Sequence, residues 1–92
     1  MSLKLAFDTR VEADLEDLPP KVCATVWRRL QGLKENPQGS STRPLAGDLQ
    51  GLRRLRIGDY RAAYYVEGDT VFVLAVGHRS RFYEIAKRRA GA

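Results

Sequence analysis

Two stretches with strand-like alternation, joined by a Gly-Asp pair, limit most strongly what this chain can fold into. Apolar side chains alternate at Leu55 and Ile57 and again at Tyr60, Ala62 and Tyr64, and Gly58-Asp59 lies between the stretches 52–57 and 60–66. This period is typical of β-strands, and a two-residue loop with glycine at its first central position closes a tight hairpin. The turn predicts a single register, in which Ile57 pairs with Tyr60 and Arg56 with Arg61.

This register assigns the side chains of the hairpin to two different faces. The face suited to burial carries Leu55, Ile57, Tyr60, Ala62 and Tyr64. The opposite face carries Arg54, Arg56 and Arg61. Adjacent like charges destabilise a sheet, whereas guanidinium groups bind phosphate through paired donors, so the arrangement favours a bound phosphodiester. A solvated basic face that protects a sheet edge is the alternative interpretation.

The N-terminal half predicts one strand and two helices. Leu3, Leu5 and Phe7 form a short alternating strand, and Thr9 and Glu12 have the spacing of a capping box. The first helix then presents Val11, Leu15 and Leu18 on one face, and the second presents Val22, Val26, Leu30 and Leu33. Pro19-Pro20 separates the two helices, and the second should stop near Asn36-Pro37. Residues 38–51 are rich in Gly, Ser and Pro and are expected to form a loop.

The C-terminal part predicts a third long strand and a final helix. A turn of two or three residues within 67–70 leads into a strand over 70–78. If Phe72, Leu74 and Val76 join the buried face, Arg79 emerges beside the other arginines. Ala63, Val71, Val73 and Ala75 would then form a floor of small residues beneath a ligand. Ser80 is expected to cap the final helix, with Phe82, Ile85 and Ala86 facing inward.

The predicted order of elements is therefore β-α-α-β-β-β-α within a single domain, residues 1–92. Two N-terminal helices should pack on a mostly antiparallel four-stranded sheet, with the helices grouped on one side, which is an α+β fold.

The net charge is +5, from 16 Lys and Arg against 11 Asp and Glu. Most basic residues lie from Arg43 onward, which favours a polyanion or an acidic protein as partner, unless the charge serves only solubility. The single cysteine, Cys23, excludes an internal disulfide and a cysteine-rich metal site. Because neither a transmembrane stretch nor a signal-peptide pattern is present, we expect a cytoplasmic protein without a membrane partner.

Four segments resemble the RelE/ParE toxin superfamily of bacterial toxin–antitoxin modules. They are LQGLKENP at 30–37, PLAG at 44–47, GLRRLRIGDYR at 51–61 and VLAVGHR at 73–79. The resemblance implies a RelE-like fold and a toxin that inhibits translation by cleaving messenger RNA in the ribosomal A site. In that family the phosphoryl group moves from the 5′-oxygen to the RNA's own 2′-oxygen, without a metal or other cofactor. It also implies a cognate antitoxin as partner, together with the ribosome and the message.

The resemblance further implies catalytic roles for five residues. Arg54 and Arg56 stand at two positions that are commonly lysine, Arg61 at the phosphate-stabilising arginine, Arg79 at the residue that assists the leaving group, and Tyr83 at the base-stacking tyrosine. Arginine does not readily give up a proton, so a general-base role becomes doubtful, whereas electrostatic stabilisation survives the change. Additional RNA contacts are expected from Arg53, Arg81, Lys87 and Arg88.

Two other functions stay open at this point. A ParE-like inhibitor of DNA gyrase would share the fold without RNA chemistry, and a non-catalytic module would use the basic face to receive acidic side chains. His78 is the only histidine and lies on the face away from Arg79, which favours a structural role over that of a base. Trp27 lies beside Val26 and Leu30 on the second helix, which favours core packing or contact with a partner. Exposed apolar positions on the first two helices, near Trp27, are expected to contact an antitoxin.

Overall fold

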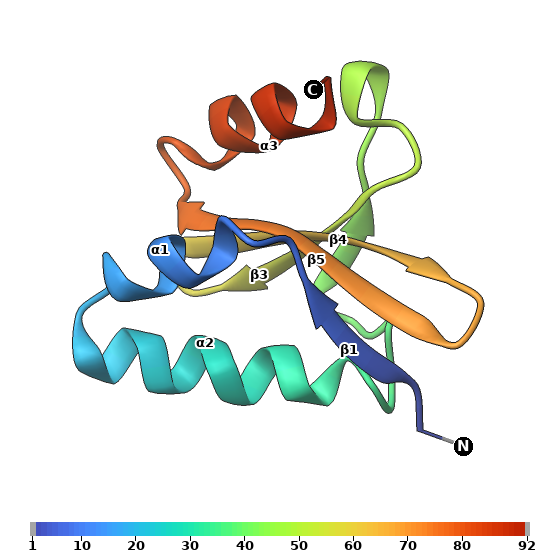
Figure 1. Ribbon diagram of the computed structural model, residues 1–92, viewed down its shortest axis with the longest axis horizontal. Helices are drawn as coiled ribbons and strands as arrows, with labels where there is room; N and C mark the ends of the chain where they lie inside the picture. Colours follow the sequence, from blue (N-terminus) through green and yellow to red (C-terminus); the bar gives the residue numbers. More distant parts are fainter. Residues whose placement is uncertain (1, 92) are drawn as a thin grey trace.

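A computed structural model describes residues 2–91 (Figure 1). The elements in chain order are β1 (Lys4–Phe7), α1 (Val11–Glu16), α2 (Pro20–Gly32), β2 (Thr42–Pro44), the 3-10 turn η1 (Gly47–Leu49), β3 (Arg53–Ile57), β4 (Tyr60–Glu67), β5 (Thr70–His78) and α3 (Phe82–Ala90). The helix α2 begins at Pro20 as predicted, and it ends at Gly32, before Asn36-Pro37, because residues 33–35 continue only as turns.

The strands form one sheet of five, in the order β1-β5-β4-β3-β2. β1 runs parallel to β5 and the other neighbours are antiparallel, so the α+β class and the mostly antiparallel sheet are confirmed. The prediction of four strands is wrong, because β2 lies within the segment expected to be a loop and pairs with β3. Three residues are too few to show alternation, and Pro44 is tolerated because β2 is an edge strand.

Two Gly-Asp pairs close the two hairpins in the same way. Ile57 pairs with Tyr60 and Arg56 with Arg61, as predicted, and Gly58 between them has a φ of +59°. The second loop also contains two residues, since Glu67 pairs with Thr70 around Gly68-Asp69. A positive φ is easily adopted by glycine and costs other residues energy, so each glycine fixes where its hairpin turns.

A bulge in β5 changes which of its side chains face the N-terminal helices. Ala63 pairs with Ala75 but the next residue, Tyr64, pairs with Val73, so Leu74 is the extra residue. The expectation that Phe72 and Leu74 join Val76 on the buried face is therefore wrong, and Val71 and Val73 take those places. An inserted residue shifts the alternation by one, which the apolar pattern of residues 70–78 conceals.

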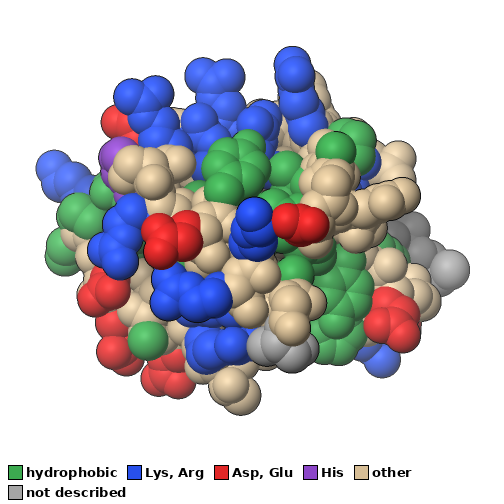
Figure 2. All heavy atoms as spheres, turned by 90° about the horizontal axis from the view of Figure 1, so that it is seen from above, with side chains coloured by type: hydrophobic (Ala, Val, Ile, Leu, Met, Phe, Trp, Pro, Cys, Tyr) green, Lys and Arg blue, Asp and Glu red, His purple; other side chains and the backbone are tan. Residues whose placement is uncertain are grey.

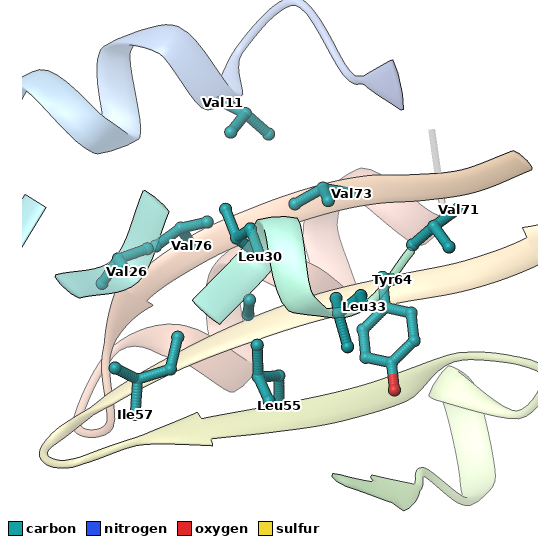
Figure 3. Close-up of a cluster of buried hydrophobic side chains, with 11 residues drawn as sticks. Val11, Val26, Leu30, Leu33, Leu55, Ile57, Tyr64, Val71, Val73 and Val76 are labelled. Carbon is teal, nitrogen blue, oxygen red and sulfur yellow. The ribbon is translucent and has the colours of Figure 1, made fainter. Parts of the chain in front are cut away.

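The main core lies between the sheet and the first two helices (Figure 3). Its labelled side chains are Val11, Val26, Leu30, Leu33, Leu55, Ile57, Tyr64, Val71, Val73 and Val76. Burial of each large aliphatic side chain contributes about 1.5–3 kcal/mol. The one polar tip in this set, the Tyr64 hydroxyl, donates a hydrogen bond to the Pro37 carbonyl and so ties β4 to the segment after α2.

The helix α3 covers the opposite face of the sheet, so the expectation that all helices share one side is wrong (Figure 1). Phe82 and Ala86 of α3 are fully buried in a second cluster with Ala63 and Ala75. The alanines leave space for the Phe82 ring, and Leu49 and Leu52 close the side of this cluster. The expected small-residue floor is thus wrong, since α3 covers its alanines and its two valines lie in the main core.

Neither predicted helix cap forms. The residue before α1 is Arg10, whose backbone N–H donates to Asp8 Oδ1 at 2.9 Å. Asp8 therefore accepts a backbone hydrogen bond next to the start of α1, where a capping box of Thr9 and Glu12 was expected. Ser80 contacts His78 Nδ1 at 2.9 Å instead of capping α3, which begins after Arg81 without a side-chain cap. For Ser80, the nearby imidazole competes successfully with the helix terminus.

Candidate functional site

The β3–β4 hairpin places three arginines on the face that carries α3. Arg54 pairs with Ala63, which is buried beneath α3, and Arg56 pairs with Arg61. Because side chains alternate along a strand, Arg54, Arg56 and Arg61 all point to that face, as predicted. The structure therefore brings together the three guanidinium groups that the hairpin register predicts.

Arg61 lies at the centre of this group. Its Nη1 donates to the carbonyl oxygens of Gly58 at 2.6 Å and Tyr60 at 2.8 Å, which holds the side chain over the turn. Burial lowers the pKa of Arg61, and the positive charges of Arg54, Arg56 and Arg79 lower it further. A fixed guanidinium group surrounded by further positive charges is suited to binding an anion.

Arg79 and Tyr83 complete the cluster from the segment between β5 and α3. The Arg79 N–H donates to the Asp59 carbonyl at 2.7 Å, which anchors this segment to the first hairpin turn. Its Nε lies 3.9 Å from Asp59 Oδ1, and both side chains are largely exposed, so the acid neutralises Arg79 only weakly. Tyr83 is 45% exposed and close enough to Arg61 to raise its pKa, opposing the neighbouring arginines.

Arg43 belongs to the same surface, although the sequence reasoning missed it. It lies on β2 directly opposite Arg54, so the two side chains share a face. A hollow of about 520 Å³ opens beside them, lined by Arg29, Ser40, Ser41, Arg43, Arg54, Arg56 and Gly58. Lys and Arg side chains gather along one edge of the face that carries α3, the upper edge in Figure 2. The one available signal was a basic residue just before the PLAG segment.

The four residues expected to add RNA contacts each have another contact within the described chain. Arg53 faces the α2 side of the sheet and donates to Thr42 Oγ1 at 2.9 Å, and Arg81 lines a separate hollow with Asp14. Lys87 lies 3.2 Å from Asp48, and Arg88 lies 3.5 Å from Glu84. These exposed pairs are weak, and contact with RNA by any of the four residues stays a prediction.

His78 makes contacts that fit a structural role. Its Nδ1 lies 2.9 Å from Ser80 Oγ, and its ring meets the Tyr60 ring edge-on at 5.4 Å. The pairing of His78 with Tyr60, and of Gly77 with Arg61, places the imidazole on the other face from Arg61. The imidazole therefore organises the end of β5 and is not aimed at the arginine cluster.

The cluster suits binding and electrostatic stabilisation of a phosphodiester. It joins several permanently charged donors, and the buried Nε of Arg54 has no hydrogen-bond partner among residues 2–91. Within residues 2–91, no group of three His, Cys, Asp or Glu side chains is placed to hold a metal ion. No helix in this range is long and apolar enough to span a membrane.

Comparisons with known proteins agree on one family. The family model described as the ParE toxin of type II toxin–antitoxin systems, parDE, matches residues 5–83. The toxin RelG of Mycobacterium tuberculosis is 32% identical over 90% of this chain and 98% of its own length. The toxin–antitoxin complex RelBE2 of the same organism contains a chain with 33% identity and a TM-score of 0.78, covering 86% of this chain and 100% of that one. A chain of the archaeal RelE–RelB complex from Pyrococcus horikoshii is 25% identical with a TM-score of 0.74, and the match covers 88% of this chain and 99% of that one.

Proposed function

This chain belongs to the RelE/ParE superfamily of toxins from type II toxin–antitoxin systems, and from that premise we propose that it is a ribosome-dependent endoribonuclease that cleaves messenger RNA in the A site. The observation that carries the proposal is the placement of Arg54 and Arg56 on one face with the fixed guanidinium of Arg61, and of Arg79 at the turn that Arg61 also contacts. The similarity to RelG and to a RelE–RelB complex supports the RelE-like branch. Ribosomes and messages place this activity in the cytoplasm.

The proposed reaction is an internal transfer within the RNA. The 2′-oxygen attacks the adjacent phosphorus, the bond to the 5′-oxygen breaks, and a cyclic phosphate and a free 5′-hydroxyl are formed. Negative charge accumulates on the phosphate oxygens as the fifth bond develops. Preorganised guanidinium groups stabilise this charge, which is often the largest contribution of an enzyme to such a step. Arg61 contacts the phosphate and Arg79 stabilises the leaving oxygen, which takes its proton from water.

The cluster supplies charge rather than a base. Arg54 and Arg56 are permanently protonated donors, so neither removes the proton of the 2′-hydroxyl. We propose that this proton passes to solvent or to a ribosomal group, and that the chain lowers the barrier by holding the phosphate and the base. Tyr83, half exposed beside Arg61, offers its ring for stacking on the neighbouring base.

We also propose that a cognate antitoxin holds this chain inactive. The RelBE2 and P. horikoshii structures are both toxin–antitoxin complexes. On this chain, Trp27 is 45% exposed and stacks on Phe7 at 5.5 Å, beside a hollow of about 360 Å³ that Val11 and Leu15 also line. Apolar side chains of the antitoxin would cover this surface. Because Trp27 is the single tryptophan, its fluorescence should shift to shorter wavelength on antitoxin binding; an unchanged spectrum in a stable complex would contradict docking here.

The second candidate is a ParE-like inhibitor of DNA gyrase, and the family model that matches residues 5–83 favours it. Induced expression with mapping of message 5′ ends separates the two functions. Endonuclease activity gives new 5′ ends within translated codons and rapid arrest of protein synthesis. Intact messages with induction of the DNA-damage response would overturn the endonuclease proposal and support gyrase inhibition.

A further inference from the structure

We propose that the hollow between β2, β3 and α2 is a second phosphate subsite, which holds the backbone phosphate next to the one that is cleaved. The ligand class is single-stranded RNA, bound through its backbone. This inference rests on the proposed RNA cleavage and adds to it Arg43 and Arg29, two binding residues outside the reacting group.

Strand pairing arranges the arginines in two rows. Arg43 lies opposite Arg54 and Arg56 lies opposite Arg61, so each row contributes two guanidinium groups from neighbouring strands. Side chains in such pairs start about 4.5–5.5 Å apart, and the rows are separated by two residues of β3, about 6.6 to 6.8 Å. Successive phosphates of an extended RNA strand have a separation of the same order. A backbone that follows β3 would therefore meet one row at each phosphate.

The lining of the hollow also suits phosphate. Arg29 reaches from α2, donates from Nη2 to the Arg56 carbonyl at 3.2 Å, and so holds its charge at the wall. Ser40 and Ser41 add hydroxyl donors. Among residues 2–91, no ion pair involves Arg29, Arg43, Arg54 or Arg56, so their charges are uncompensated.

An RNA backbone fits this lining better than an acidic peptide. The residues around the hollow are arginines, serines and one glycine, which offer no apolar side chain for a peptide to bury against. The hollow is also continuous with the reacting group, because Arg54 and Arg56 belong to both. A strand whose scissile phosphate lies at Arg61 would place a neighbouring phosphate at Arg43.

The test compares two uncleavable 2′-O-methyl oligonucleotides without terminal phosphates: a dinucleotide with one internal phosphate and a trinucleotide with two. Binding is measured by NMR titration at low salt. Wild type should bind the trinucleotide about tenfold more tightly than the dinucleotide, because one additional charged phosphate contact contributes about that factor. Arg43→Gln should abolish this difference and leave dinucleotide affinity unchanged, and Arg29→Gln should reduce it. Lys4→Gln, which removes an exposed cation on β1 at the opposite edge of the sheet from β2, is the control and should behave as wild type.

Each remaining outcome contradicts the subsite. A trinucleotide advantage that persists in folded Arg43→Gln would overturn the subsite, as would equal binding of both oligonucleotides, or of neither, by wild type. Binding of a hexaglutamate peptide with the same Arg43 dependence, without a trinucleotide advantage, would assign the hollow to an acidic protein partner. Cleavage of messages on ribosomes tests the proposed function separately, so failure of the subsite alone leaves message cleavage intact.

Discussion

Asp14 on α1 and Arg89 on α3 form a largely buried two-armed ion pair across the edge of β5. Arg89 Nη1 lies 2.6 Å from Asp14 Oδ2, and Nη2 lies 2.8 Å from Oδ1. The same two side chains also bond to backbone groups of β5 beyond the part that pairs with β1. Arg89 donates to the Leu74 carbonyl, and Asp14 accepts from the Val76 N–H. This pair therefore connects the layers on both faces of the sheet and fixes α3 beside the arginine cluster.

Loss of one partner should be costly. Arg89→Met leaves the Asp14 carboxylate buried without its cation, and we expect a loss of about 3 kcal/mol in the free energy of unfolding. Urea denaturation at neutral pH measures this. Arg88→Met is the matched control, because Arg88 forms only an exposed pair with Glu84 and its loss should cost below about 0.5 kcal/mol. Equal stability of the two variants would contradict the role of the buried pair.

The arginine cluster should reduce stability in the absence of an anion. Arg56 is exposed and faces Arg61 directly, so Arg56→Gln relieves repulsion between like charges and should raise the unfolding free energy by about 0.5 kcal/mol at low salt. Phosphate ions should raise the melting temperature of wild type more than that of the variant, because they bind the folded cluster. Calorimetry at constant ionic strength checks both effects. A less stable variant with an unchanged phosphate response would show that the arginines do not form one anion site.

Asp8 should make folding sensitive to acid. The hydrogen bonds from the Arg10 side chain and then its backbone lower the pKa of Asp8 from 3.8 to about 2. A carboxyl group with a lowered pKa stabilises the fold above the unfolded value, and this contribution is lost as pH falls from about 4 to about 2. Since Arg10 is half exposed, we expect about 1 kcal/mol at neutral pH.

Thermal denaturation of Asp8→Asn across pH 2 to 6 tests this expectation. The difference in stability between Asp8→Asn and wild type should reach its full value above about pH 4 and should vanish near pH 2. Asp17→Asn provides the control, because Asp17 is an exposed acid directly after α1, the helix that Asp8 precedes. A difference that stays constant over the whole range would exclude Asp8 as its titrating source.

Turn chemistry explains why the core of the site was predictable from sequence. Gly58-Asp59 permits one tight turn, that turn permits one register, and the register places Arg56 opposite Arg61. Local rules of this kind act within a few residues. They predict the hairpin and its arginine face without knowledge of the rest of the chain.

The remaining features depend on contacts between distant residues. Phe82 is buried against Ala63 and Ala75, and this contact places α3 on the second face of the sheet. No local sequence pattern predicts the space that the two alanines leave for the ring. The short strand β2 exists because β3 offers it an edge, and Arg43 joins the site only through that pairing. The bulge at Leu74 is likewise hidden in an apolar run.

The most direct test of the central claim is single-turnover cleavage of a message on programmed ribosomes by wild type and by Arg61→Gln. Wild type should give a 2′,3′-cyclic phosphate and a 5′-hydroxyl at the A-site codon. Arg61→Gln should lower the rate about 100-fold or more, as loss of one preorganised donor to a developing charge does, while its circular dichroism spectrum stays unchanged. Cleavage by the folded variant at the wild-type rate would contradict a catalytic arginine cluster.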